Sequence, residues 1–357
     1  MDPTVFFTPD EVARARAYHR PLYLALAADI ALSTVVTALL AFSWLGDRLF
    51  DATAGPWWVR SLLFTVLVLA LIETARLPLA FWRGFIRERR WGFSTQSGRA
   101  WAVDQLKGFG VGVVLTGAAL VALIGSVRLC PSWWPLVAAV GALVLVLLLV
   151  FVAPLLLEPI FNRFEPLADA ELAAALRGLA QRAGVPVRDV LVADASRRTR
   201  KHNAYVSGIG RTRRVVIFDT LLGEAAQSEL EVVVAHELGH RRHRDVAKAT
   251  LLAMASAGLA VLVAWPLDPT PRHIPLLLLV WGLLELASLP LTAAFSRRLE
   301  RRADRFAIEL TRDAGAFETA FRRLAKANLA DLDPPRLVYA LIFTHPTPVQ
   351  RIAAATS

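Results

Sequence analysis

The sequence predicts a mainly α-helical protein that crosses a membrane about six times and carries a polar domain with a small β-sheet. Of its 357 residues, 55% are hydrophobic and the mean hydropathy is +0.47, which is too apolar for a soluble protein of this length. Long apolar segments alternate with Arg-rich ones, and one polar stretch contains short β-branched runs. These three observations favour a polytopic protein of the lipid bilayer.

The apolar segments define the membrane part. Each is long enough to cross a hydrocarbon core of about 30 Å as a helix. The segment before the first of them contains Asp2, Asp10 and Glu11 and no signal-peptide cleavage pattern, so the first span is expected to remain as an anchor. The six predicted spans are 21–45, 57–80, 108–127, 134–157, 246–267 and 274–295.

The formal net charge of +10 is unevenly distributed along the chain, and this distribution predicts the orientation of the protein in the membrane. If the Arg-rich segment 81–107 is cytosolic, then the amino terminus, residues 158–245 and the tail from 296 are cytosolic too, and these segments hold most of the Lys and Arg residues. Nucleic acid is therefore not an expected partner. The predominance of Arg over Lys favours a GC-rich genome and a prokaryotic cell membrane. The outer loops hold only Arg48, Arg60, Arg128 and Arg272.

The chain is expected to divide into four parts. Residues 1–157 form an amino-terminal membrane domain of four spans, and residues 246–295 form a membrane hairpin of two spans. The polar parts, 158–245 and 296–357, must then converge into one domain from either side of the hairpin.

The first polar part has the pattern of a helix, a small sheet and a second helix. An Ala- and Leu-rich helix is predicted over 168–183 and ends at a Gly-Val-Pro sequence. The second helix is predicted over 228–243, with Ser228 as N-cap and Glu231 completing a capping box. This helix is expected to run directly into the fifth span. The predicted strands are 190–193, 204–207 and 214–218.

The second helix carries an H-E-x-x-H sequence from His236 to His240. Positions i and i+4 share one face of a helix, so both imidazoles can bind one zinc ion. Glu237, one residue further round, reaches the zinc-bound water. One zinc ion per chain is therefore the predicted cofactor.

A catalytic zinc site needs a third protein ligand beside these two histidines. Cys130 is the only cysteine, so histidine and carboxylate are the available ligand types. The candidates are His243, Glu285, Glu300 and Glu309.

Glu300 is the favoured third ligand. It begins the polar segment after the last span, and Asp304 lies one helical turn further, where it could accept the free imidazole N–H of a ligand histidine. His243 would supply a third ligand from the same helix, which does not easily close a tetrahedron, and Glu309 is turned to the opposite helical face. Ordinary ion pairs of Glu300 and Asp304 with neighbouring arginines are the alternative interpretation.

Three acidic residues, Asp29, Glu73 and Glu285, fall inside predicted spans. An acid at this depth is costly unless it is paired or faces water. Glu73 has Arg76 on its own helical face, whereas Asp29 and Glu285 have no partner within their spans. These acids indicate an aqueous cavity between the spans.

Further motifs follow one another along the chain. They are Leu77-Pro78, 85–93, 154–167, Asn203-Ala204-Tyr205, 216–222, the segment 296–304 around Glu300, and His345-Pro346 with Arg351. Together with H-E-x-x-H, they make the sequence resemble the integral-membrane zinc metalloproteases of the CAAX prenyl endopeptidase type, which are HtpX-related gluzincins. The resemblance implies a cytosolic, gluzincin-like zinc protease domain.

The same resemblance implies a role for each motif. The protein would be a metalloendopeptidase that hydrolyses peptide bonds with a zinc-activated water, with Glu237 as general base and Asp304 as supporting acid. His345 would stabilise the oxyanion, and Arg351 would bind a substrate carboxylate or carbonyl. An extended peptide would add as a strand beside Asn203, Ala204 and Tyr205.

Two departures from the family concern the substrate. Six spans are predicted where the eukaryotic prenyl endopeptidase has seven, and Trp91 and Asp245 stand where that branch often has histidine. The substrate could be a CAAX-type prenylated polypeptide or another membrane-associated one. Outside this class, the alternatives are a polytopic transporter with a metal site and an inactive binding protein. The transporter is disfavoured, because a transport site does not need a general base such as Glu237 next to a metal ligand.

Overall fold

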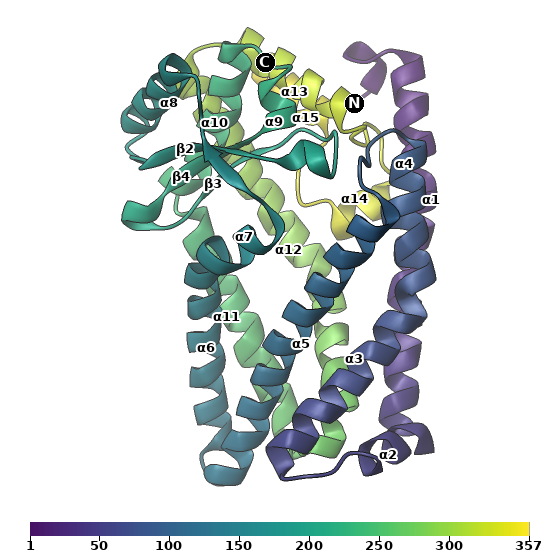
Figure 1. Cartoon of the computed structure of the whole chain (residues 1–357). Helices are drawn as coiled ribbons and strands as arrows, with labels where there is room; N and C mark the ends of the chain where they lie inside the picture. The colour runs from purple at the N-terminus through teal and green to yellow at the C-terminus, as the bar shows by residue number, and fades with distance from the viewer. Residues whose placement is uncertain (357) are drawn as a thin grey trace.

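The structure is a bundle of long helices with a polar unit at one end. A computed structural model describes residues 1–356. Within this range six helices are long and apolar enough to cross a membrane, and both chain termini lie at the end of the bundle that carries the sheet (Figure 1). The predicted polytopic, mainly α-helical class is confirmed. The six segments are Pro9–Phe42, Trp57–Arg90, Gly98–Leu129, Trp134–Phe161, Asp245–Leu267 and Pro271–Thr311.

The helices of the bundle extend beyond the apolar segments read from the sequence. The first, α1, begins at Pro9 because Thr8 is its N-cap and Glu11 closes a capping box. π-Helical turns over Trp82–Arg87 and Ala153–Leu157 continue α3 and α6 toward the polar unit. The helices of the bundle are α1 (Pro9–Phe42), α2 (Trp44–Asp51), α3 (Trp57–Phe81), α5 (Gly98–Leu129), α6 (Trp134–Val152), α11 (Asp245–Ala264) and α12 (Ile274–Thr311).

An ion pair joins two of the membrane helices. The Arg76 guanidinium on α3 contacts both Asp29 carboxylate oxygens on α1, at 2.9 and 2.8 Å, and also contacts Glu73 at 2.8 Å. Asp29, which has no partner within its own span, therefore finds one on a neighbouring helix. Asp29, Arg76 and Glu285 line a cavity of about 260 Å³ between α1, α3 and α12, whereas Glu73 does not.

The polar unit contains a mixed four-stranded sheet with the order β1-β2-β4-β3. β2 and β4 are parallel, whereas β1 and β3 pair with their neighbours in antiparallel orientation. The three predicted strands are confirmed, but β1 was not expected, because three residues ending in proline carry no strand pattern. The strands are β1 (Phe164–Pro166), β2 (Asp189–Ala193), β3 (Ala204–Ser207) and β4 (Arg214–Phe218).

The turn between β3 and β4 requires glycine at Gly208. Its φ is +80°, and a Cβ there would lie 2.3 Å from the Thr212 carbonyl oxygen. This tight turn fixes the register of β3 on β4, with Ala204 opposite Ile217. Every residue of β3 therefore has a defined inward or outward direction.

Helices cover the sheet and enclose one core with it. Leu176, Ile217, Leu238 and Phe317 are fully buried there, and Phe7 at the start of the chain joins them. The amino terminus is thus part of the polar unit. Its helices are α4 (Glu88–Arg90), α7 (Glu158–Phe161), α8 (Ala170–Arg182), α9 (Asp219–Leu222), α10 (Gln227–Arg242), α13 (Ala314–Ala327), α14 (Arg336–Ile342) and α15 (Pro348–Thr356).

The H-E-x-x-H helix, α10, differs at both ends from the sequence expectation. Its N-cap is Ala226, whose N–H donates to the Glu229 carboxylate at 3.0 Å. The predicted capping box of Ser228 and Glu231 is therefore wrong, because the helix begins two residues earlier. The helix also does not run straight into the fifth span. Arg244 adopts a left-handed conformation with φ +56°, which ends α10 at Arg242 and starts α11 at Asp245 in a new direction.

The Asp29–Arg76 pair generates a stability prediction. Arg76→Leu should lower the free energy of unfolding by about 2 kcal/mol, because it removes the two hydrogen bonds to the buried Asp29 carboxylate and leaves Arg83, at 3.7 Å, as its remaining ion-pair partner. Thermal denaturation in detergent would measure this loss. The double variant Asp29→Leu/Arg76→Leu should recover part of the lost stability, since neither charge remains; a double variant as unstable as the single one would contradict this account.

Candidate metal centre

The candidate site forms where α10 and α12 approach each other closely. Gly239 on α10 permits this approach, because a Cβ there would lie 3.2 Å from the Ala303 Cα and 3.1 Å from the Phe306 ring. The contact brings His236 and His240 of α10 against Glu300 of α12, two segments that the membrane hairpin separates in the chain. The glycine of the H-E-L-G-H sequence is thus explained by helix packing.

The three side chains lie at the distances that a tetrahedral zinc site requires. The His236 and His240 Nε2 atoms are 3.2 Å apart, and Glu300 oxygens lie 3.3 Å and 3.4 Å from them. With ligand bonds of about 2.0–2.1 Å, the edge of a tetrahedron is about 3.3 Å. The Glu300 Oε2 atom is also buried without a hydrogen-bond partner. This donor set and the orphaned oxygen fit a zinc ion held by two histidines and one carboxylate.

A carboxylate lies behind each of the two histidines. Asp304 Oδ1 is 2.9 Å from His236 Nδ1, as expected from the sequence, and Asp245 Oδ2 is 3.1 Å from His240 Nδ1. Such contacts direct Nε2 toward the site and fix the histidine tautomer. The Asp245 contact was missed. The sequence does contain an acid five residues after His240. Its contact with His240 depends on the left-handed conformation of Arg244, which the sequence does not predict.

Arg351 on α15 has a partner within the protein, Asp304, which the sequence did not predict for it. Its guanidinium contacts both oxygens of Asp304 and lies over the Phe321 ring, 3.8 Å from the centroid. The side chain is thus held by the protein, and it also lines the cavity that Glu237 faces. In this position Arg351 keeps Asp304 ionised and oriented toward His236.

His345 lies at the edge of the metal cluster. Its Nε2 is 3.2 Å from Glu300 Oε1, and its Nδ1 is 2.9 Å from the Thr344 hydroxyl. Burial lowers the pKa of His345, so the imidazole is neutral near pH 7. In the tautomer with its proton on Nε2, the imidazole would accept from Thr344 at Nδ1 and present the Nε2 hydrogen to the cluster.

Glu237 faces a cavity of about 540 Å³ with His236 and His345 in its wall. Its carboxylate makes no hydrogen bond or ion pair with the described residues. Burial raises the pKa of this carboxyl group. The group is therefore a proton acceptor directed at open space beside the three candidate ligands.

The structure brings two of the three predicted substrate-edge residues to this cavity. Asn203 and Ala204 line it, whereas the Tyr205 side chain is turned to Glu158, with the phenol oxygen 3.4 Å from a carboxylate oxygen. The alternation of side chains along a strand explains the difference. Asn328, which also lines the cavity, was not expected from the sequence.

The three other candidates for the third ligand lie outside the cluster. His243 packs against the Phe306 ring, Glu285 lines the membrane cavity, and Glu309 is exposed. Glu300 is the candidate that the fold places beside both histidines.

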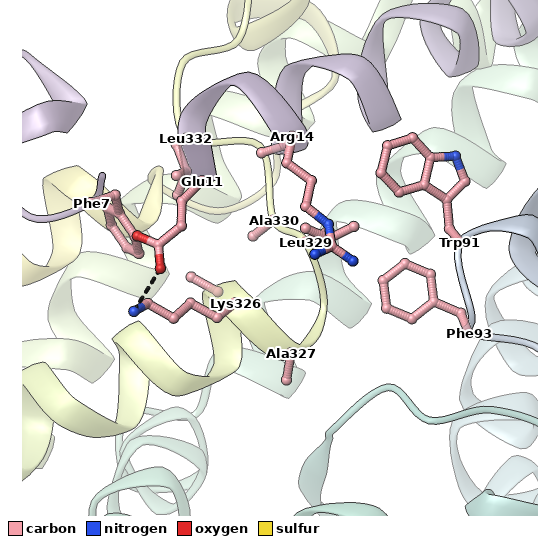
Figure 2. Close-up of a pocket in the computed structure, with 12 residues that line it drawn as sticks. Phe7, Glu11, Arg14, Trp91, Phe93, Lys326, Ala327, Leu329, Ala330 and Leu332 are labelled. Atoms are coloured by element: carbon pink, nitrogen blue, oxygen red, sulfur yellow. Dashed lines mark ion pairs between the residues drawn. The ribbon is translucent and has the colours of Figure 1, made fainter. Parts of the chain in front are cut away.

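A second pocket adjoins the cavity at the start of α1. It has a volume of about 230 Å³, and Ala325 and Ala330 line both spaces. Figure 2 shows Trp91 and Phe93 on one side of it and the Glu11–Lys326 ion pair on the other. Trp91, one of the departures from the prenyl-endopeptidase pattern, therefore lies in this outer pocket and outside the metal cluster.

Comparisons with known proteins agree with this architecture. A model described as peptidase family M48 matches residues 166–357, and one described as the CAAX prenyl protease N-terminal region with five membrane helices matches residues 6–163. Among the described helices, four candidate spans fall within the second range.

Individual relatives come from bacteria and eukaryotes. The uncharacterized metalloprotease YhfN of Bacillus subtilis is 30% identical over 99% of this chain and 87% of its own length. The CAAX prenyl protease 1 homolog of Arabidopsis thaliana is 28% identical over 83% of this chain and 73% of its own. The crystal structure of S. mikatae Ste24p has the same fold, with a TM-score of 0.82 at 22% identity over 98% of this chain and 89% of that one.

The membrane bundle, the cluster between two helices and these matches define a membrane-embedded metalloprotease. More particularly, the chain belongs to peptidase family M48, in the branch of the CAAX prenyl proteases. The resemblance read from the sequence is confirmed. Family membership also favours the protease over the transporter that the sequence left open.

The contact of Asp245 with His240 generates a prediction about metal affinity. Asp245→Asn should weaken zinc binding about 10- to 100-fold, because the imidazole loses the charged acceptor that directs its other nitrogen. Competition with a chromophoric chelator would measure the change. Glu309→Gln is the matched control, since this exposed acid lies outside the cluster; equal affinities for the two variants would refute the role of Asp245.

Proposed function

We propose that the protein is a zinc endopeptidase in which His236, His240 and Glu300 hold the metal. The observation that carries the proposal is the arrangement of these three donors at zinc-like spacing, with the Glu237 carboxylate free beside them in the cavity. A metal that served only to stabilise the fold would be enclosed by four protein ligands, whereas this donor set leaves one position open.

The reaction follows from the placement of the protein groups. Bound zinc supplies a Lewis acid that brings the pKa of water at the site toward 7. Glu237 takes a proton from the attacking water and delivers it to the leaving amine. The raised pKa of Glu237 suits both transfers, since a group that titrates closer to neutrality both accepts and releases a proton readily.

The neighbouring side chains have supporting roles. His345 donates its Nε2 hydrogen to the oxygen that gains negative charge on the substrate carbonyl. Asp304 orients His236, and Arg351 acts through Asp304 by holding its carboxylate. Ala204 presents its main chain to an extended peptide at the edge of the sheet, and the Asn203 side chain lines the same cavity.

We further propose that the catalytic unit and both termini are cytosolic. The segments at the sheet end of the bundle contain most of the Lys and Arg residues, as the positive-inside rule requires of the cytosolic side. A substrate reaching this site is a membrane-associated polypeptide, either with a CAAX-type prenylated tail or without one. The relatives include bacterial and eukaryotic proteins, and the Arg-rich composition favours a prokaryotic membrane for this one.

A direct assay tests the substrate class. The purified protein is incubated with a farnesylated C-terminal CAAX peptide and, separately, with the same peptide unprenylated, each with and without a zinc chelator. Cleavage that chelation abolishes and zinc restores is expected for at least one peptide. Equal cleavage of both would show that the prenyl group is not required, and cleavage that survives chelation would exclude the proposal.

The role of Glu237 has its own test. Glu237→Gln should keep zinc binding and lower peptide hydrolysis by a factor of about 10² to 10⁴, because the amide cannot accept the proton. Glu231→Gln, on the same helix and outside the cavity, is the matched control and should hydrolyse at the rate of the unchanged protein. Unchanged turnover in Glu237→Gln would contradict the mechanism. If the unaltered protein hydrolysed no peptide either, an inactive binding protein would be favoured.

A further inference from the structure

β3 has one edge that the sheet does not use. It is the last strand in the order β1-β2-β4-β3, so β4 pairs with one edge only. The other edge lies beside α10 and opens into the cavity that Glu237 lines. Main-chain groups on this edge are therefore the ones that an added peptide strand can meet.

The register shows which residues face the open edge. In an antiparallel pair, successive residues turn their N–H and C=O groups alternately toward and away from the neighbouring strand. Phe218 N–H donates to the Asn203 carbonyl at 3.0 Å, so residue 203 faces β4. It follows that His202, Ala204 and Val206 face the open edge.

The side chain of Asn328 occupies the first of these three positions. Its Oδ1 accepts from the His202 N–H at 2.8 Å, and its Nδ2 donates to the His202 carbonyl at 2.9 Å. A carboxamide bonded in this way takes the place that the peptide group of an added strand would take. Both main-chain groups of His202 are thereby withdrawn from substrate.

Asn328 is held in place by the chain around it. It ends α13, with its N–H bonded to the Leu324 carbonyl at 3.0 Å. The next residue, Leu329, adopts φ +46°, and its carbonyl lies 2.6 Å from the His19 Nε2 on α1. The carboxamide is therefore presented to β3 from a fixed position between two helices.

A second side chain occupies the other end of the edge. The Arg241 guanidinium, from α10, donates to the Val206 carbonyl. Between the two occupied positions lies Ala204, whose N–H and C=O face the cavity. Its methyl group is buried in the core, with 5% of the residue exposed, so a substrate meets its main chain alone.

From this arrangement we infer that Asn328 and Arg241 are positioning residues that restrict substrate pairing to one residue of the strand, Ala204. The inference rests on the proposed function. A strand that offered three residues would pair with a longer stretch of the substrate backbone. A single pairing residue between two occupied positions limits the main-chain hydrogen bonds on this edge to the part of the peptide that meets Ala204.

Backbone methylation of the substrate tests the inference on the unaltered protein. A series of CAAX peptides, farnesylated or unprenylated according to which form is cleaved, is methylated at one amide nitrogen at a time. On this edge of β3, methylation of the amide that donates to the Ala204 carbonyl should lower kcat/KM about tenfold or more. The amides two residues to either side along the paired face should tolerate it. Sensitivity at two or three such amides would overturn the inference.

Freeing His202 should add a pairing position. In Asn328→Leu the main chain of His202 becomes available, so a second sensitive amide should appear in the methylated series, two residues from the first. Gln181→Leu, which replaces an exposed amide on α8, is the control and should keep the single sensitive amide. An Asn328→Leu enzyme with one sensitive amide alone would contradict the positioning role.

A more conservative variant, Asn328→Asp, tests the inference if Asn328→Leu does not fold. Asn328→Asp keeps the acceptor for the His202 N–H and loses the donor to the His202 carbonyl, so this carbonyl can accept from a substrate amide and a second amide should become sensitive to methylation. A single sensitive amide in a folded Asn328→Asp protein would again contradict the inference. Absence of any hydrolysis by the unaltered protein would instead reject the proposed function itself, so the two failures are distinguishable.

Discussion

The close contact of α10 with α12 is the constraint on which the rest of the structure depends. Gly239 lets the two helices meet at Ala303, and at this separation Glu300 lies 3.3 and 3.4 Å from the two histidines of α10. The segments are far apart in sequence, because α11 and the span of α12 lie between them. The geometry of the metal cluster is therefore maintained jointly by the polar core and by the packing of a membrane hairpin.

Several charged side chains are buried around this contact, and each carboxylate behind a histidine forms an ion pair with an arginine. Asp304 is paired with Arg351, and Asp245 is paired with Arg302, so each carboxylate behind a histidine has its own guanidinium. A buried carboxylate without such a partner would be protonated or would destabilise the fold. The arginines of the cluster thus compensate the charge of two acids next to the candidate metal ligands.

The sequence predicted the parts of this protein that local patterns encode. Long apolar runs identified the six spans, and i, i+4 spacing placed His236 and His240 on one face of a helix. The contacts that escaped prediction all depend on tertiary structure. The partner of Asp29 lies on another span, Asp245 faces His240 only because Arg244 turns the chain, and the carboxamide of Asn328 meets β3 from a different helix. Spacing along the chain does not encode these distances.

The length of α12 couples the cluster to the bilayer. The helix is continuous from Ile274 to Thr311, and Glu300 lies about 39 Å along it from its first residue, at 1.5 Å per residue. A tilt of about 2° around that far end would move the carboxylate by roughly 1.4 Å, whereas ligand distances in a metal site are held to about 0.2 Å. A change in bilayer thickness that tilts α12 relative to α10 would therefore change the distances between the candidate ligands and with them the affinity for the metal.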